Sequence, residues 1–94
     1  MSHEIIAGIR LNLYEATILA KERFILFDRE GSLTRIAHGL DQYAHTHNQK
    51  VYFDGVYFYI GSKVSQPIDG NVDISWCQGQ GTCAMYSAHS LQEL

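Results

Sequence analysis

The segment comprising residues 50–64 reads KVYFDGVYFYIGSKV, and it restricts the local structure that this chain can form. The dipeptide Asp54-Gly55 lies between two apolar runs. Such a dipeptide favours a type I′ turn, because both of its residues tolerate positive φ angles. We therefore expect a β-hairpin whose two-residue turn is Asp54-Gly55, and this turn sets which residues of the two strands face each other.

The expected hairpin separates its side chains into two chemically different faces, because successive side chains along a strand point to opposite sides. With this turn, Phe53 lies opposite Val56 and Tyr52 lies opposite Tyr57. The apolar face is expected to hold Val51, Phe53, Val56, Phe58 and Ile60. The other face is expected to hold Lys50, Tyr52, Tyr57 and Tyr59. A slip of one residue would mix the two sets, so the pattern specifies the register.

The segment that precedes the hairpin has helical periodicity, and Ser32 is a candidate N-cap residue. Its apolar positions recur at the spacing of one helix face: Leu33, Ile36, Ala37, Leu40, Tyr43 and Ala44. Its polar positions take the other side: Thr34, Arg35, His38, Asp41, Gln42 and His45. This pattern predicts an amphipathic helix that is weakest at Gly39 and ends at residues 47–49.

The first part of the chain fits two periodicities. Within residues 4–20, Ile9, Leu11 and Leu13 alternate with polar residues, which is typical of a strand. A helical stripe also fits Ile5, Ile9, Leu13 and Ala16, but Gly8, Asn12 and Thr17 weaken a helix. A strand is therefore favoured for this segment, and a helix remains open as the alternative.

A short apolar run, residues 24–27, follows this segment. Asp28, Gly31 and Ser32 come after it and are typical of a turn. We expect Phe24 to Phe27 to form a buried strand.

The last third of the chain reads as a loop, a second hairpin and a tail. Residues 64–71 surround the single proline and are expected to be a connecting loop. Residues 72–88 alternate around a turn at residues 78–81 and predict a hairpin, although a short helix after residue 82 is also open. Residues 89–94 are expected to fray.

Together these elements predict an α+β fold in one domain of 94 residues. We expect a small antiparallel sheet of about five strands, built from two hairpins, with one amphipathic helix packed on it. Short hairpin connections rather than crossover helices indicate the antiparallel arrangement.

Charge and hydropathy exclude several classes of protein. The net charge is −3, and residues 64–94 carry all of it, because they contain three acidic residues and no basic one. A basic nucleic-acid-binding surface is therefore not expected. An apolar run long enough to span a membrane is absent, and residues 1–14 lack the pattern of a secretory signal. We expect a cytoplasmic protein in which Cys77 and Cys83 stay reduced.

Signatures of catalysis and metal binding are weak in this sequence. Five histidines are scattered along the chain: His3, His38, His45, His47 and His89. The spacing of Cys77 and Cys83 is not that of a usual zinc ligand pair. The GQGT tetrapeptide lacks the lysine of a phosphate-binding loop. We expect no catalytic residue, no metal ion and no cofactor, and therefore a protein that is not an enzyme.

The features that remain favour binding to a protein partner. Tyrosine combines a large apolar body with a polar tip and is enriched at interfaces. The expected contact residues are Tyr52, Tyr57, Tyr59 and Lys50 of the hairpin, and Arg35, His38, Asp41, Gln42 and His45 of the helix. An acidic last third could steer the chain towards a basic partner, such as a nucleic-acid-binding enzyme.

A small chain without motifs is typical of phage or mobile-element proteins that inhibit a host defence system, as anti-CRISPR proteins do, or of immunity proteins that neutralise a toxin. Two alternatives remain open. The tyrosine face could stack the bases of a nucleotide or nucleic acid. It could instead be buried in a homodimer or a larger assembly of the same chain.

Overall fold

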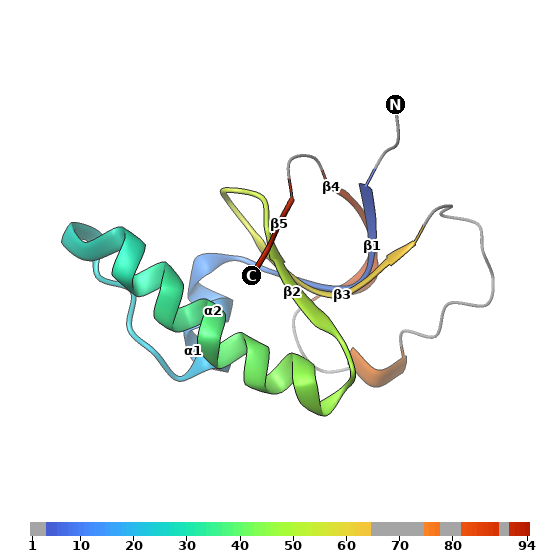
Figure 1. The fold of residues 1–94 in the computed structure, drawn as a ribbon, viewed down its shortest axis with the longest axis horizontal. Helices are drawn as coiled ribbons and strands as arrows, with labels where there is room; N and C mark the ends of the chain where they lie inside the picture. The colour runs from blue at the N-terminus through green and yellow to red at the C-terminus, as the bar shows by residue number, and fades with distance from the viewer. Residues whose placement is uncertain (1–3, 65–74, 78–81, 89–90) are drawn as a thin grey trace.

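The computed structural model describes residues 4–64, 75–77, 82–88 and 91–94. Its centre is a five-stranded antiparallel sheet with the strand order β4-β1-β3-β2-β5, and a long helix, α2, lies across one face (Figure 1). The elements are β1 (Glu4–Leu11), α1 (Leu13–Ala20), η1 (Leu26–Asp28), α2 (Arg29–Thr46), β2 (Lys50–Phe53), β3 (Phe58–Val64), η2 (Ser75–Cys77), β4 (Thr82–Ala88) and β5 (Gln92–Glu93). The predicted α+β class, the sheet and the packed helix are confirmed.

The first segment contains both of the predicted types of element, a strand at Glu4–Leu11 followed by a helix at Leu13–Ala20. Asn12 separates β1 from α1 and caps the helix. Its Oδ1 accepts the Glu15 backbone N–H at 2.8 Å, and Glu15 Oε1 accepts the Asn12 N–H at 3.0 Å. This reciprocal capping box satisfies two backbone donors at the start of α1. Lys21 ends the helix with a φ angle of 58°.

The helix α2 begins earlier than its sequence pattern predicts. Arg29 is its first residue, and Ser32 lies fully buried inside it. The Ser32 hydroxyl accepts the Ile25 N–H at 2.9 Å and is 3.3 Å from the Ile25 carbonyl oxygen. Ser32 is therefore not an N-cap, because its hydroxyl bonds to the preceding connection rather than to its own helix.

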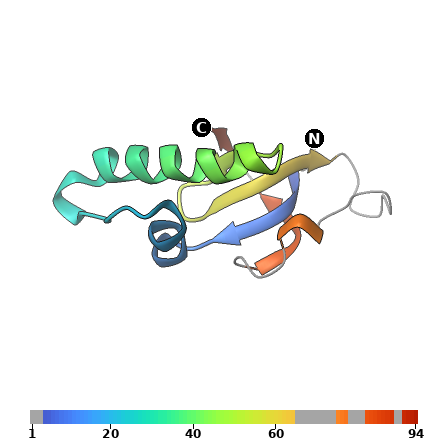
Figure 2. The ribbon, with the colours of Figure 1, turned by 90° about the horizontal axis from the view of Figure 1, so that it is seen from below.

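Gly39, the weak position of the predicted helix, lies where α2 crosses α1. A Cβ atom added there would be 2.7 Å from the Ala20 carbonyl oxygen and 2.8 Å from Ala20 Cβ. Glycine is thus needed for the close approach of the two helices. Figures 1 and 2 show α1 against the middle of α2, and the N-terminal end of α2 extends beyond the sheet.

The predicted buried strand at residues 24–27 is wrong. Leu26 and Phe27 belong to the short helix η1, and they are 83% and 94% exposed. Only Phe24 packs against the core. The segment connects α1 to α2 beside the overhanging part of α2 and does not enter the sheet, so the apolar run has no strand to pair with.

The β2–β3 hairpin forms, but its register differs from the prediction by two residues. Phe53 pairs with Phe58 and Tyr52 with Tyr59, so residues 54–57 form the connection. Asp54 Oδ1 accepts the backbone N–H groups of Val56 at 2.8 Å and Tyr57 at 2.7 Å. These bonds hold a longer loop than the two-residue turn that Asp-Gly favours.

A shift of two residues preserves the face of every side chain in the paired strands, because the side-chain period of a strand is two. Val51, Phe58 and Ile60 therefore lie in the core beneath α2, as predicted. Val56 is the exception, since it lies in the loop and is 63% exposed.

The sheet buries apolar residues on both faces. The main core lies between the sheet and the helices and contains Ile9, Leu11, Ala16, Ile36, Leu40, Ala44, Val51, Phe58, Ile60 and Cys77. A second cluster on the opposite face contains Ile6, Tyr52 and Tyr59, with Tyr57, Tyr86 and Leu91 packed against it. The curvature of the sheet towards this second face is visible in Figure 1.

The C-terminal region follows the prediction in part. Residues 82–88 form a strand, whereas Trp76 belongs to the short helix η2 and not to a strand. The expected loop beyond Val64, the expected strand residues 72–74 and the expected turn at 78–81 lie outside the described residues. In the expected tail, Gln92 and Glu93 pair with Phe53 and Tyr52 as β5.

Cys77 and Cys83 are joined by a disulfide bond, with their Cα atoms 5.8 Å apart. The expectation that both thiols stay reduced is therefore not met. The bond connects η2, whose Cys77 is fully buried, to the first residues of β4. A Cα separation of this size is ordinary for a disulfide.

Candidate functional site: an open hollow along helix α2

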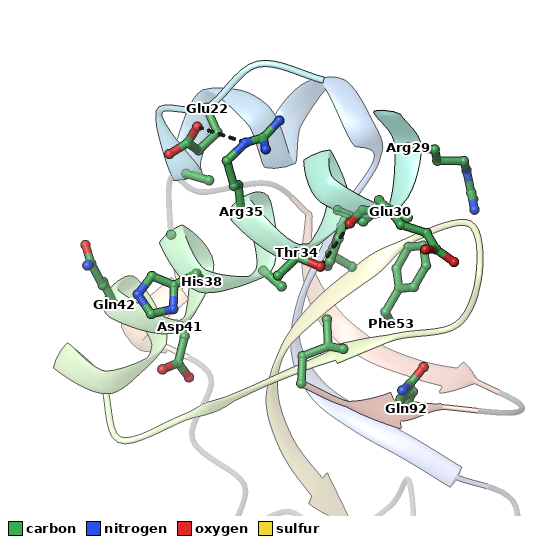
Figure 3. Close-up of a pocket in the computed structure, with 16 residues that line it drawn as sticks. Glu22, Arg29, Glu30, Thr34, Arg35, His38, Asp41, Gln42, Phe53 and Gln92 are labelled. Atoms are coloured by element: carbon green, nitrogen blue, oxygen red, sulfur yellow. Dashed lines mark hydrogen bonds and ion pairs between the residues drawn. The ribbon is translucent and has the colours of Figure 1, made fainter. Parts of the chain in front are cut away.

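The five helix residues predicted to contact a partner are all exposed on α2. They are Arg35, His38, Asp41, Gln42 and His45. The first four line an open hollow that follows the helix, and Figure 3 shows their side chains along its outer side. His45 does not line it. The amphipathic pattern thus correctly identified the solvent-facing side of this helix.

The hollow has one wall formed by the sheet and one formed by α1. On the sheet side, Phe53 of the hairpin and Gln92 of β5 lie beside α2 (Figure 3), together with Leu94. On the other side, Ala20 and Glu22 lie at the end of α1. The hollow is open, so it suits the surface of another macromolecule better than an enclosed small ligand.

Charged side chains surround the beginning of α2. Arg35 lies 4.0 Å from a carboxylate oxygen of Glu22 and 3.8 Å from one of Asp28, in ion pairs that are 40–52% exposed. Exposed pairs of this length contribute little to stability. Arg29 Nη2 donates to the Gly55 carbonyl at 3.4 Å, which connects the start of α2 to the hairpin loop. The arrangement gives a charged rim that remains accessible.

Large apolar side chains are exposed at the same end of the helix. Leu26 and Phe27 immediately precede α2, Val56 lies in the loop that Arg29 contacts, and Leu94 is 45% exposed in the wall of the hollow. The sequence pattern did not predict this exposed group, because the apolar run at residues 24–27 is typical of a buried strand. One feature could have indicated the exposure of this run: it is only four residues long and lies between two helices, so it has little length to form a strand of the sheet.

Two of the three tyrosines that were predicted to form an exposed binding surface are buried. Tyr52 and Tyr59 are only 4% and 3% exposed, because Leu91, near the C-terminus, and the ring of Tyr86 pack over this face. Tyr57 is half-buried. The rings of Tyr52 and Tyr59 are therefore closed to the base-stacking and partner contacts that we expected of them.

The hydrogen bonds of this face explain the burial of its polar atoms. The Tyr59 hydroxyl donates to Asp54 Oδ2 at 2.7 Å. Burial, followed by this bond to Asp54, raises the pKa of Tyr59 to about 12. Burial alone would raise the pKa of Asp54, but the hydrogen bonds from Tyr57, Tyr59 and Val56 outweigh it and lower that pKa.

Lys50, the fourth predicted hairpin contact, is exposed and already paired. Its Nζ lies 3.1 Å from Glu93 Oε1. The hydrogen bond to Glu93 raises the pKa of Lys50. The pair connects β2 to β5 on the surface, so Lys50 contributes no uncompensated charge at this point.

Histidine, cysteine and carboxylate side chains do not form a metal site in the part of the chain that the structure describes, where no group of three or more comes together. His47 instead packs its ring between Tyr43 and Trp76, with ring centroids 4.7 and 5.5 Å away. Its role there is packing at the end of α2.

Comparison with known proteins finds no relative: no family model, no curated protein and no solved structure matches this chain. Among the described residues, no helix has the length and hydrophobicity needed to cross a membrane. The geometry of the α2 surface is therefore the basis for a functional proposal.

Proposed function

We propose that this chain is a non-enzymatic binding protein that covers a surface of a protein partner, and that Leu26 and Phe27 are the residues that anchor the contact. The observation that carries the proposal is the exposure of Phe27, which at 94% leaves almost the whole ring in water. An aromatic side chain gains most when a partner removes it from water.

The surroundings of the two residues support a docking surface rather than an isolated apolar side chain. Asp28 follows directly, and the next two residues, Arg29 and Glu30, line the beginning of the hollow along α2. An apolar centre with a charged rim is the usual composition of a protein interface. Arg35, His38, Asp41 and Gln42 extend the same surface along the helix.

The class of the partner is proposed from the charge of the sequence. A basic target, such as a nucleic-acid-binding enzyme of a defence system or a toxin, remains the partner class that the acidic last third of the sequence favours. A cytoplasmic location is proposed with it, on the sequence grounds given above.

The test is an affinity capture from the cells in which the protein acts, with the wild type and two variants. Leu26→Ser with Phe27→Ser removes the proposed anchors. Ile18→Ser is the matched control, because Ile18 is also an exposed apolar residue at 59% but belongs to α1 rather than to the segment that precedes α2. Neither variant is expected to change stability by more than about 0.5 kcal/mol, since all three positions are exposed.

The proposal predicts that one protein is captured by the wild type and by Ile18→Ser, and that the Leu26→Ser, Phe27→Ser variant loses it. Equal capture by all three proteins would exclude Leu26 and Phe27 as anchors. Sedimentation of the purified wild type provides a second readout. A dimer that the double variant converts to a monomer would mean that the surface binds a second copy of this chain instead of another protein.

A further inference from the structure

The side chain of Arg10 lies between two tyrosine rings on the sheet face that is opposite α2. Its Cζ atom is 4.6 Å from the centre of the Tyr57 ring and 4.7 Å from the centre of the Tyr86 ring. Tyr57 comes from the hairpin loop and Tyr86 from β4, while Arg10 belongs to β1 in the interior of the sheet. The guanidinium is therefore held by three separate parts of the fold.

Stacking uses the faces of a guanidinium and leaves its N–H groups, which lie in its plane, at the edge. One of these N–H groups is directed to the Tyr59 hydroxyl, where Arg10 lowers the pKa of the phenol, and the others are left for a ligand. Within residues 4–64 and the described parts of the C-terminal region, no carboxylate forms an ion pair with Arg10. Arg10 is also half-buried, so its charge is partly removed from water. A charge in this position is stabilised when an oxyanion meets its N–H donors.

The carboxylate of Asp54 and the guanidinium of Arg10 both interact with the Tyr59 hydroxyl. Both oxygens of Asp54 already accept hydrogen bonds. Its Oδ1 accepts two backbone N–H groups, and its Oδ2 accepts the hydroxyl of Tyr59. Its position is fixed by these bonds as part of the hairpin loop. Asp54 thus adds negative charge to the surroundings of Arg10 without forming an ion pair with it.

We propose that Arg10 is the centre of an anion-binding site that takes a carboxylate group. The planar fork of an arginine matches the two oxygens of a carboxylate, and both tyrosine rings keep the fork in place before the ligand arrives. A ligand with a single negative charge fits better than a phosphate dianion, because the nearby charge of Asp54 repels the additional charge.

This site is separate from the proposed contact at Leu26 and Phe27. Arg10 faces the second cluster of the sheet, whereas Leu26 and Phe27 lie beside α2. Loss of one function is therefore expected to leave the other intact, and each is tested by its own variant.

The experiment is an NMR titration of the labelled protein with sodium acetate, which follows the side-chain Nε–H of Arg10 and the backbone amides of Tyr57 and Tyr86. Sodium chloride and sodium phosphate at matched ionic strength are the control titrations. We expect a saturable shift with acetate and none with chloride. Arg10→Lys keeps the charge but loses the fork, and it should weaken acetate binding by about tenfold or more.

A shift of equal size in chloride would overturn the proposal, because it would show only screening. Tighter binding of phosphate than of acetate would overturn the assignment to a carboxylate, and unchanged acetate binding by Arg10→Lys would exclude the fork. If Arg10→Lys does not fold, Tyr57→Leu replaces it, because this variant removes one ring from the loop and should weaken acetate binding severalfold. Unchanged binding by Tyr57→Leu would also contradict the proposal.

Discussion

The hydroxyl of Tyr59 donates a 2.7 Å hydrogen bond to Oδ2 of Asp54, and this bond connects the buried face of β3 to the loop that joins β2 to β3. Asp54 meanwhile accepts the N–H groups of Val56 and Tyr57 with its other oxygen. One carboxylate therefore determines both the length of the loop and the position of a buried phenol. The protonation of these two groups should influence stability at opposite ends of the pH range.

The first prediction concerns acid. The pKa of Asp54 in the folded chain is lower than its ordinary value of 3.8. Its ionised form thus contributes stability that is present above that ordinary value and is lost as the pH falls through the lower native pKa. Asp54→Asn should reduce the free energy of unfolding by about 1–3 kcal/mol near neutral pH.

Urea denaturation of the wild type and of Asp54→Asn at about pH 7 and about pH 2 checks this expectation. The difference between the two proteins should shrink at the acidic pH, because protonation of Asp54 removes the charge that its hydrogen bonds stabilise in the folded wild type. A difference that stays constant with pH would show that the carboxylate charge does not stabilise the loop. Asp41→Asn, at an exposed position of α2, is the control.

The second prediction concerns alkali. The pKa of Tyr59 is raised from 10.0 to about 12. The neutral phenol therefore contributes stability that is complete below 10.0 and is lost as the pH rises through about 12. In an ultraviolet absorbance titration, Tyr59 should ionise late, as the pH passes through about 12. Tyr59→Phe should remove this late step, and its persistence in that variant would assign the late step to another ring.

The hairpin shows what its sequence pattern could specify and what it could not. The alternation of side chains identified the core face, because it places Val51, Phe58 and Ile60 together on one side of the hairpin and the tyrosines on the other. The loop length depended on the hydrogen bonds of the Asp54 side chain, which do not appear in the alternation of apolar and polar residues. An error of two residues left the faces correct, so the pattern carried no signal against it.

The candidate site was predictable on α2 and not elsewhere. Helical periodicity placed Arg35 and His38 on the outside, since one side of an amphipathic helix must face water. Phe27 was predicted to be buried and is exposed, whereas Tyr59 was predicted to be exposed and is buried. Each depends on tertiary contacts: residues 24–27 have no neighbouring strand, and residues from β4 and the C-terminal segment cover the tyrosines. Local composition does not contain this information.

The third prediction separates the core from the proposed contact surface by using two phenylalanines. Phe58 is fully buried and its ring centre lies 4.5 Å from that of Phe53, so Phe58→Ala should cost about 3–5 kcal/mol of stability. Phe27→Ala should change stability by less than about 0.5 kcal/mol, because its ring is already in water. Chemical denaturation measures both values. Similar losses in the two variants would contradict the exposure of Phe27.

The fourth prediction concerns the disulfide between Cys77 and Cys83. Six positions separate the two residues, so the bond closes a short loop and should contribute about 2 kcal/mol by restricting the unfolded chain. Cys77→Ser with Cys83→Ser should lose about this amount, and the polar replacement of the fully buried Cys77 should add to it. Cys77→Ala with Cys83→Ala is the matched variant that removes the bond without burying a hydroxyl.

Alkylation of the protein in intact cells, followed by mass spectrometry, tests whether the bond exists where the protein acts. A cytoplasmic location predicts that a labelling reagent modifies a substantial share of both thiols, since that compartment keeps cysteines reduced. Protection of both cysteines until a reductant is added would instead place the folded protein in an oxidising compartment. In that case the stability of the oxidised form is the relevant one, and the cytoplasmic assignment based on the sequence is wrong.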